Sequence, residues 1–295
     1  MLHIMRINFH QSYRLLEKRW QSSTTFVRLN KRISELNLCS RREADRLIRQ
    51  GKVKVNGVVA NLGEKVSFDL SANQIEFIHE DDDTTTVQAV VLNKPLGFVS
   101  GQAEHGHAPA IRLLSQDRLW DSDFDNYKQL PSSWKGYAPA GRLDLNSTGL
   151  LVFSSSGILA KKIIHHESKV EKEYIVDVVP AQQITKRERQ IDENFKLPDT
   201  TMDLSRLRQG GGTLLGDTRQ LLPCAEAEWI DEGKRLRIVL TEGRKHHIRR
   251  VCRELLGYHV VQLQRIRIGP IMLGDLPQGC WRPLIQDEWN VLLNN

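Results

Sequence analysis

An acidic run that contains no apolar residue, EDDDTTT at residues 80–86, divides this chain of 295 residues into two unequal parts. Such a run buries nothing and its like charges repel one another, so it favours an extended linker over a packed element. Three consecutive aspartates on a flexible segment do not converge on one metal ion without a scaffold. The sequence therefore predicts a small domain over residues 27–79, this linker, and a larger domain over residues 87–290.

The first 26 residues have a composition of their own. They contain Arg6, Arg14, Lys18 and Arg19 but only Glu17 as an acid, and they end in a cluster of serine and threonine. A basic, acid-poor leader is typical of an organellar transit peptide, and a disordered basic tail has the same composition. We expect a mitochondrial or plastid location in the first case and a cytoplasmic one in the second.

Residues 27–79 carry the local signals of two helices and a hairpin. Ser40 followed by Glu43 predicts a capped helix start, in which the serine hydroxyl takes an orphan amide and the glutamate reaches back to the cap. Gly51 predicts the end of that helix about ten residues later. The pair Asn56-Gly57, inside KVKVNGVVA, is the strongest short-range signal of a β-hairpin.

The same segment concentrates positive charge. Between residues 28 and 54, nine basic side chains stand against three acids, Glu35, Glu43 and Asp45. The basic residues are Arg28, Lys31, Arg32, Arg41, Arg42, Arg46, Arg49, Lys52 and Lys54. Arginine side chains match phosphate oxygens, and a helix start near Arg41 adds a dipole that attracts anions. A solvated basic face is the alternative explanation.

The stretch SRREADRLIRQGKVKVNG, in its setting of about residues 27–75, resembles the S-four type (alpha-L) RNA-binding module. The resemblance implies that this domain recognises the shape and backbone of RNA more than its base sequence. The basic residues from which we expect RNA contacts are Lys31, Arg32, Arg41, Arg42 and Arg46.

From Val87 onward, strand-like and helix-like segments alternate. β-branched runs such as VQAVVLNKP, GLLVFSSSG, EYIVDVV and RLRIVLTEG are separated by turn clusters, whereas SGILAKKIIHH and HIRRVCRELLG have helical spacing. This pattern predicts an α+β domain with a mixed, mainly antiparallel sheet. The three glycines at 210–212 lack the strand-to-helix context of a phosphate-binding loop, and we expect a mobile insertion there.

One carboxylate of the larger domain is set among unusual neighbours. In GRLDLNSTGLL, residues 141–151, Asp144 lies between Arg142 and a cluster of turn-forming residues. Such residues form Asx-turns, so a purely structural role explains the pattern. A reactive carboxylate presented by a rigid turn explains it as well. This stretch alone leaves both hypotheses open.

Three further segments occur in order around Asp144: NKPLGFVSG at 93–101, EKEYIVDV at 171–178 and EGRKHHIRR at 242–250. Together with the front module and the closing RIRIGPIMLGDLPQGCWRPL, they resemble the RsuA-type pseudouridine synthases, which modify ribosomal RNA. The resemblance spans about residues 27–285. It implies an enzyme that breaks the bond between uracil and ribose, rotates the base and rejoins it through a ring carbon, without a cofactor. The subgroup implies large-subunit RNA as the substrate.

The resemblance also implies roles for single residues. By motif position Asp144 is the reacting carboxylate, Arg249 is the arginine that pairs with it, and Tyr174 is the tyrosine that stacks on the target base. A cation is needed because an isolated buried carboxylate would take up a proton. Arg142 corresponds to a basic side chain near the flipped nucleotide, since a stacked uridine is unreachable without flipping. Taken singly, Tyr174 is also an ordinary strand aromatic, and both arginines are ordinary phosphate-binding residues.

We also expect RNA contacts in the larger domain from Lys94, Arg244 and His247. The family usually has glutamine at the position of His247. If this side chain orients Arg249 by a hydrogen bond, an imidazole in place of an amide makes the enzyme sensitive to pH.

The sequence predicts no metal site. Adjacent histidines at 165–166 and 246–247 point in different directions, and no carboxylate or thiol spacing completes a ligand set. The four cysteines include no CxxC pair, which favours a reducing compartment. We expect a monomer without a membrane-spanning segment. The alternatives to a ribosomal RNA synthase of the large-subunit type are an inactive ribosome-associated RNA-binding factor and a synthase for small-subunit or transfer RNA.

Overall fold

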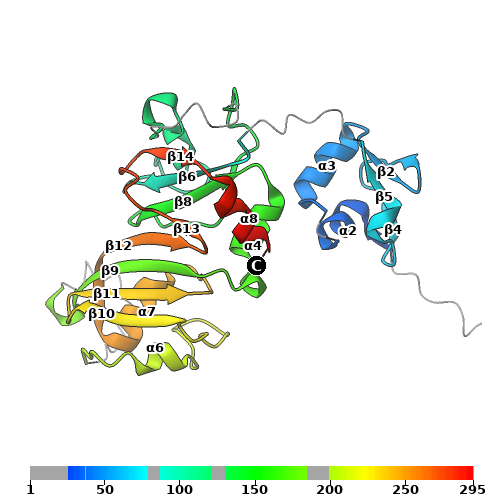
Figure 1. The fold of residues 1–295 in the computed structure, drawn as a ribbon. Coiled ribbons are helices and arrows are strands. Elements are labelled where there is room, and N and C mark those ends of the chain that lie inside the picture. The colour runs from blue at the N-terminus through cyan, green and yellow to red at the C-terminus, as the bar shows by residue number, and fades with distance from the viewer. Residues whose placement is uncertain (1–25, 37, 79–86, 121–129, 185–198, 295) are drawn as a thin grey trace, which may run out of the picture. The chain divides into compact units, whose positions relative to one another are not determined.

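The structure is a computed structural model that describes residues 26–36, 38–78, 87–120, 130–184 and 199–294. The chain forms two units, Met1–Asp82 and Asp83–Asn295 (Figure 1). The predicted linker at 80–86 and the first 25 residues of the basic leader lie outside the described residues. Phe26, which we placed at the end of the leader, instead lies in the first strand, because it pairs with Ser67. Among the helices of the described ranges, none is both long and apolar enough to cross a membrane.

The described part of the front unit combines two helices with short strands. Its elements are β1 (Phe26–Arg28), α2 (Leu29–Glu35), α3 (Arg41–Arg49), β2 (Val53–Val55), β3 (Val58–Val59), β4 (Lys65–Ser67), the 3₁₀ turn Ala72–Gln74 and β5 (Ile75–Phe77). Strand β1 pairs with β4, and β2 lies between β3 and β5, all antiparallel. Leu29 and Ile33 of α2 meet Ala44 and Ile48 of α3 in one buried core.

The local signals in this unit act largely as predicted. The hydroxyl of Ser40 accepts a hydrogen bond from the backbone N–H of Glu43 at 3.2 Å, so α3 begins at a capped end. The carboxylate of Glu43 forms an ion pair with Arg46 one turn later, where we had expected it to reach back to the cap. Asn56 and Gly57 have φ values of 49° and 80°, the left-handed pair that a tight hairpin requires.

The second unit is built on one mixed sheet. In the described residues it has nine strands in the order β10-β11-β9-β12-β8-β6-β14, with β13 beside β12 and β7 beside β8. The strands are β6 (Ala89–Lys94), β7 (Ala138–Pro139), β8 (Thr148–Ser154), β9 (Lys172–Pro180), β10 (Glu226–Asp231), β11 (Arg235–Leu240), β12 (Tyr258–Ile268), β13 (Ile271–Met272) and β14 (Trp281–Pro283). The helices are α4 (Gly157–Ile164), α6 (Ser205–Gln209), α7 (His247–Leu256) and α8 (Gln286–Asn294). Only β12 and β8 pair in parallel among these strands, so the predicted mainly antiparallel α+β architecture is confirmed.

The two faces of the sheet carry different cores. On β8, Leu150 and Val152 belong to a core that α4 and α8 cover, whereas Leu151 and Phe153 point to the opposite face. A third core lies between α7 and strands β9, β11 and β12. Figure 1 shows α4 and α8 beside the β14-β6-β8 half, and α6 and α7 beside the β9-β11-β10 half. The Asp144 stretch immediately precedes β8, between the two halves.

The segment around the triple glycine belongs to the third core. Leu204, Leu207, Leu214 and Leu221 are all buried there. The backbone N–H of Gly211 donates to the carbonyl of Leu221 at 2.9 Å, which closes the segment on itself. The prediction of a mobile insertion was wrong, because the glycines were judged without the leucines on either side of them.

The parallel pairing of β8 with β12 depends on Gly149. This residue lies opposite Arg265 and has a φ of +99°. A Cβ atom at Gly149 would come within 2.2 Å of the carbonyl oxygen of Arg265. No side chain fits at that distance, so only glycine lets the two strands approach beside the Asp144 stretch.

We therefore expect Gly149→Ala to lower the free energy of unfolding by more than about 3 kcal/mol, since it adds a backbone clash to an unfavourable φ. Gly136→Ala is the matched control, because Gly136 has a similar φ of +95° but no atom within 4 Å of an added Cβ. It should cost about 1 kcal/mol. Urea unfolding of both variants measures the difference. Equal losses would show that the close approach to Arg265 does not matter.

Candidate active site

The Asp144 loop, residues 142–150, is fastened to its surroundings through its backbone. The hydroxyl of Ser100 donates to the carbonyl of Leu143 at 2.7 Å and accepts from its N–H at 2.9 Å. The N–H of Ser147 donates to the carbonyl of Asp144 at 3.1 Å, which closes a turn directly after the carboxylate. The Asp144 side chain remains 34% exposed. The turn therefore presents the carboxylate at an open position, and this geometry is compatible with either hypothesis for the stretch.

Three cations from three different elements bind carbonyl groups of this loop. Lys94, at the end of β6, donates from Nζ to the carbonyl of Ser147 at 2.8 Å. Arg249 of α7 donates from Nη2 to the carbonyl of Asn146 at 2.6 Å. Arg265 of β12 donates from Nε to the carbonyl of Leu150 at 2.8 Å and from Nη1 to that of Arg142 at 3.3 Å. Charge-assisted hydrogen bonds of this kind are stronger than neutral ones, so the loop is held at four points.

Lys94 lies entirely inside the protein. Its side chain is fully buried, and its Nζ also donates to the carbonyl of Pro95 at 3.0 Å. Burial lowers the pKa of Lys94 to about 8; the nearby charge of Asp144 opposes this shift, and that of Arg265 adds to it. The prediction that Lys94 contacts RNA was wrong, because the strand before the NKP motif is buried on both faces.

Arg249 lies beneath the Asp144 loop but does not contact its carboxylate. The second Nη nitrogen donates to the carbonyl of Val260 at 2.9 Å, so both Nη groups are engaged with backbone. Within the described ranges, no ion pair shorter than 4.0 Å joins Arg249 to Asp144. Burial lowers the pKa of Arg249, while the charge of Asp144 acts in the opposite direction. The expected direct pair is thus replaced by a longer electrostatic interaction.

The side chain that faces the Asp144 carboxylate is His246. Its Nδ1 lies 3.9 Å from Oδ2 of Asp144. We had weighed His246 only as half of a histidine pair and had assigned it no role at the site. The sequence signal was present, since His246 immediately precedes the helix that carries Arg249.

Tyr174 lies on β9 at the junction of two cores. It is half-buried and packs against the core under α7 and against the core of β6 and β8 on the same face of the sheet. Its partner on β12 is Arg265, which in turn lies opposite Gly149 of β8. Tyr174 therefore lies on the strand directly beside that of Arg265, whose guanidinium binds carbonyl groups of the Asp144 loop.

Arg265 is a second residue that the sequence reading missed. Its side chain is 4% exposed, and its remaining nitrogen, Nη2, has no hydrogen-bond partner in the described part of the chain. The only signal in the sequence was an arginine inside an otherwise strand-like run, QLQRIRIG. Arg142, by contrast, has an exposed side chain beside Asp144, as a residue near a bound nucleotide requires.

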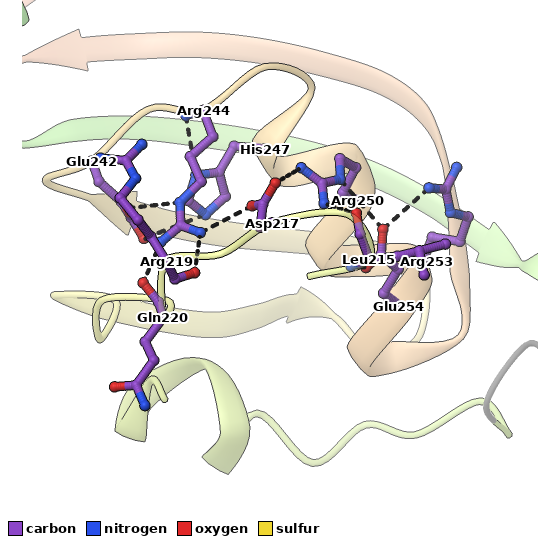
Figure 2. A network of polar contacts seen from close by, with 10 residues as sticks. All are labelled: Leu215, Asp217, Arg219, Gln220, Glu242, Arg244, His247, Arg250, Arg253 and Glu254. Atoms are coloured by element: carbon purple, nitrogen blue, oxygen red, sulfur yellow. Dashed lines mark hydrogen bonds and ion pairs between the residues drawn. The ribbon is translucent and has the colours of Figure 1, made fainter. Parts of the chain in front are cut away.

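A network of charged groups fixes the entry to α7 (Figure 2). Asp217 accepts from Nη1 of Arg244 and from Nη1 of Arg250, both at 3.0 Å. Arg244 also pairs with Glu242 at 3.0 Å and donates to the carbonyls of Arg219 and Gln220. Its side chain is only 7% exposed. The prediction of an RNA contact at Arg244 was therefore wrong.

His247 belongs to the same network and also has no free face for RNA. Its Nδ1 accepts from the backbone N–H of Arg244 at 3.3 Å, and its Nε2 points to Glu242 at 3.9 Å. Burial lowers the pKa of His247, so the neutral imidazole is favoured. In the described part of the chain, no hydrogen bond joins His247 to Arg249, whose Nη groups bind backbone carbonyls instead, so the expected role of orienting that arginine is not fulfilled. The predicted RNA contact at His247 was wrong for the same reason.

In the front unit, the five predicted RNA-binding residues fall into three groups. Arg32 binds within the front unit. Its Nε donates to the carbonyl of Leu70 at 2.8 Å, and its Cζ lies 4.9 Å from the centre of the Phe68 ring. The half-exposed Lys31 and Arg46 form ion pairs with neighbouring glutamates. Arg41 and Arg42 are exposed at the start of α3. The basic surface that remains open is thus centred on these last two arginines.

The burial of Lys94 predicts a pH dependence of stability. Its pKa of about 8 in the folded protein lies below its ordinary value of 10.5. Between these values the unfolded chain binds more protons than the folded one, so the free energy of unfolding rises with pH, by up to about 3 kcal/mol. Wild type should therefore gain stability over Lys94→Met between pH 8 and 10.5, measured by urea unfolding of both proteins. A difference that stays constant over this range would contradict the shift.

Comparison with known proteins agrees with this geometry. Residues 88–254 match the RNA pseudouridylate synthase family, and residues 27–70 match the S4 domain. The chain is 34% identical to the dual-specificity RNA pseudouridine synthase RluF of Escherichia coli, over 89% of this chain and 77% of that protein. It is 33% identical to an uncharacterized RNA pseudouridine synthase of Aquifex aeolicus, over 89% and 92% of the two chains. It is 31% identical to the ribosomal large subunit pseudouridine synthase B of Vibrio cholerae, over 90% and 74%.

A solved crystal structure of a pseudouridylate synthase has the same fold. It superposes with a TM-score of 0.54 at 26% identity and covers 90% of this chain and 99% of its own. The order of the two domains, the mixed sheet and the family match all agree. The chain therefore belongs to the RNA pseudouridine synthase family and carries an S4 RNA-binding domain in front of its isomerase domain.

Proposed function

We propose that the substrate of this synthase is ribosomal RNA, specifically that of the large ribosomal subunit. One relative in Vibrio cholerae is named as a synthase of the large ribosomal subunit. The front unit supports a structured RNA as partner, because its exposed arginines lie at a capped helix start. We further propose that the protein acts as a monomer.

The assignment of the reacting group rests on the structure of the Asp144 loop. A half-exposed carboxylate lies on a backbone that Lys94, Arg249 and Arg265 hold through its carbonyls. We propose Asp144 as the carboxylate that acts on the target uridine.

The chemistry that these residues serve is an isomerisation. The bond from the ring nitrogen of uracil to the anomeric carbon of ribose breaks, the base rotates, and its carbon 5 bonds to the same anomeric carbon. The hydrogen on carbon 5 leaves as a proton and the released ring nitrogen takes up a proton, so the composition of the nucleotide is unchanged. Tyr174, at the junction of the two cores, offers an aromatic face against which the flipped base stacks. Its hydroxyl is the proposed aid to the proton removal.

Replacing the reacting carboxylate tests this proposal. Asp144→Asn keeps the shape of the side chain but removes its charge, so we expect the rate to fall by on the order of 10³-fold or more. Ribosomal RNA from a deletion strain is incubated with each protein, and carbodiimide-reactive uridines are mapped. RNA binding by the variant, measured by filter retention, should stay within about twofold of wild type.

The controls of this assay separate the alternatives. An unmodified ribosomal RNA after incubation with wild type would contradict the proposal and favour an inactive RNA-binding factor. Modification of transfer RNA or small-subunit RNA in parallel incubations would move the substrate to those RNAs. An adduct that persists with Asp144→Asn would assign the reaction to another group.

The exposed arginines of α3 predict how salt affects RNA binding. Arg41→Ala and Arg42→Ala should each reduce the slope of log K against log salt by roughly 0.7 to 0.9, because one phosphate contact and its released counterion are lost. Lys65→Ala removes the same charge from an exposed position on β4 and should leave the slope unchanged. Equal slopes for all four proteins would place the docking surface elsewhere.

We also propose the basic leader as an organellar address. Its support is its composition, which is basic and poor in acids, and it lies outside the described residues apart from Phe26. A fusion of residues 1–30 to a fluorescent reporter decides between a mitochondrial or plastid signal and a disordered cytoplasmic tail.

A further inference from the structure

The Asp144 carboxylate has one charged or titratable neighbour within 4.0 Å among the described residues, and that neighbour is His246. Its Nδ1 lies 3.9 Å from Oδ2, and the two side chains are 48% and 34% exposed. Solvent therefore reaches both side chains. At this distance the two groups interact electrostatically, and a small movement of either side chain would bring them within hydrogen-bonding distance.

The backbone at His246 aims the imidazole at the carboxylate. His246 has φ 52° and ψ 30°, a left-handed conformation that few residues other than glycine adopt, although histidine, asparagine and aspartate are the most frequent among them. Helix α7 begins at the next residue, and the N–H of Arg250 donates to the carbonyl of His246 at 3.0 Å. Such a conformation persists only where the surroundings determine it.

The charged network in Figure 2 is what determines it. Arg244, two residues before, is held by Asp217 and Glu242 at 3.0 Å each. His247, the next residue, is buried and accepts from the backbone N–H of Arg244. Lys245 and His246, the two residues between these fixed flanks, are both exposed, and of the two it is His246 whose imidazole lies within 4.0 Å of the Asp144 carboxylate.

The three cations that hold the Asp144 loop donate to backbone carbonyls. Both Nη groups of Arg249 donate to carbonyls, and Nζ of Lys94 donates to two. Arg265 binds the carbonyls at the two ends of the loop. These cations place the loop, which leaves the carboxylate oxygens themselves to His246.

We propose that His246 is a positioning residue whose imidazolium form orients the Asp144 carboxylate when the target nucleotide covers the site. The inference rests on the proposed role of Asp144. The basic residues near the pair are Arg249 on the following turn of α7, Lys94 behind the loop, the exposed Arg142 on the loop, and Lys245, which precedes His246 in the chain. Among the described residues, Asp144 is the one acidic side chain within 4.0 Å of the His246 imidazole.

The proposal predicts an effect on turnover more than on stability or binding. An exposed ion pair is screened by water in the free protein and contributes little there. Once the nucleotide excludes water, the same pair acts in a lower dielectric and its interaction strengthens. Histidine changes charge between about pH 5 and 8, so kcat should fall as pH rises through this range.

Two substitutions test this directly. His246→Asn suits the left-handed backbone but removes the charge, and we expect kcat to fall on the order of tenfold with KM changed less than twofold. His246→Arg keeps a positive charge at every pH of the assay. It should recover most of the activity and lose the fall in kcat above pH 7. At pH 8.5, where histidine side chains are generally neutral, its kcat should exceed that of wild type.

A matched control comes from the same unit. His165 lies at the end of α4, is 43% exposed and faces the carboxylate of Glu167 at 3.7 Å. His165→Asn should leave kcat and its pH profile unchanged. Thermal unfolding of each variant checks that the fold is retained, and the arginine variant decides the question by its pH profile even if His246→Asn melts early.

The outcomes separate this inference from the proposed function. If wild type is active, Asp144→Asn is inactive and His246→Asn matches wild type in kcat and pH profile, the inference is overturned and the function stands. If His246→Arg still loses activity above pH 7 as wild type does, the inference is also overturned. A wild type that modifies no RNA overturns both.

Discussion

The second unit depends on a cluster of positive side chains buried beneath one loop. Lys94, Arg249 and Arg265 come from β6, α7 and β12, and each donates hydrogen bonds to carbonyl groups of residues 142–150. Three cations close together repel one another, which is part of why the pKa of Lys94 is lowered. The carboxylate of Asp144 offsets this repulsion, so the loop and its cations stabilise each other.

Close approach of the backbone makes this cluster possible. Gly149 lies against Arg265 where β8 and β12 pair in parallel, and a side chain there would collide with the carbonyl of Arg265. The glycine therefore brings β12 near enough for the guanidinium of Arg265 to reach both ends of the loop. Tyr174, on the neighbouring strand β9, pairs with Arg265, so the register of β9 against β12 fixes the position of Tyr174.

Three basic residues of the stretch EGRKHHIRR, at 242–250, have different roles in the fold. Arg244 and His247 turn inward to Glu242 and Asp217 and fix the start of α7. His246, between them, turns outward to Asp144. A stretch that looks uniformly basic in sequence is thus divided by the helix into a buried half, which holds the backbone, and an exposed half, which faces the carboxylate.

The sequence by itself determined the elements and the class of protein. Ser40, Gly51 and the Asn56-Gly57 pair act within a few residues, so their signals survive in the fold. The motif order around Asp144 likewise identified the family. Only the tertiary structure decided which basic side chains are buried. Lys94, Arg244 and His247 contact groups up to 53 residues away, at Ser147 in the case of Lys94, and local spacing carries no information about such partners. The same holds for His246, whose carboxylate partner lies about a hundred residues earlier in the chain, because the packing of α7 on the sheet alone brings them together.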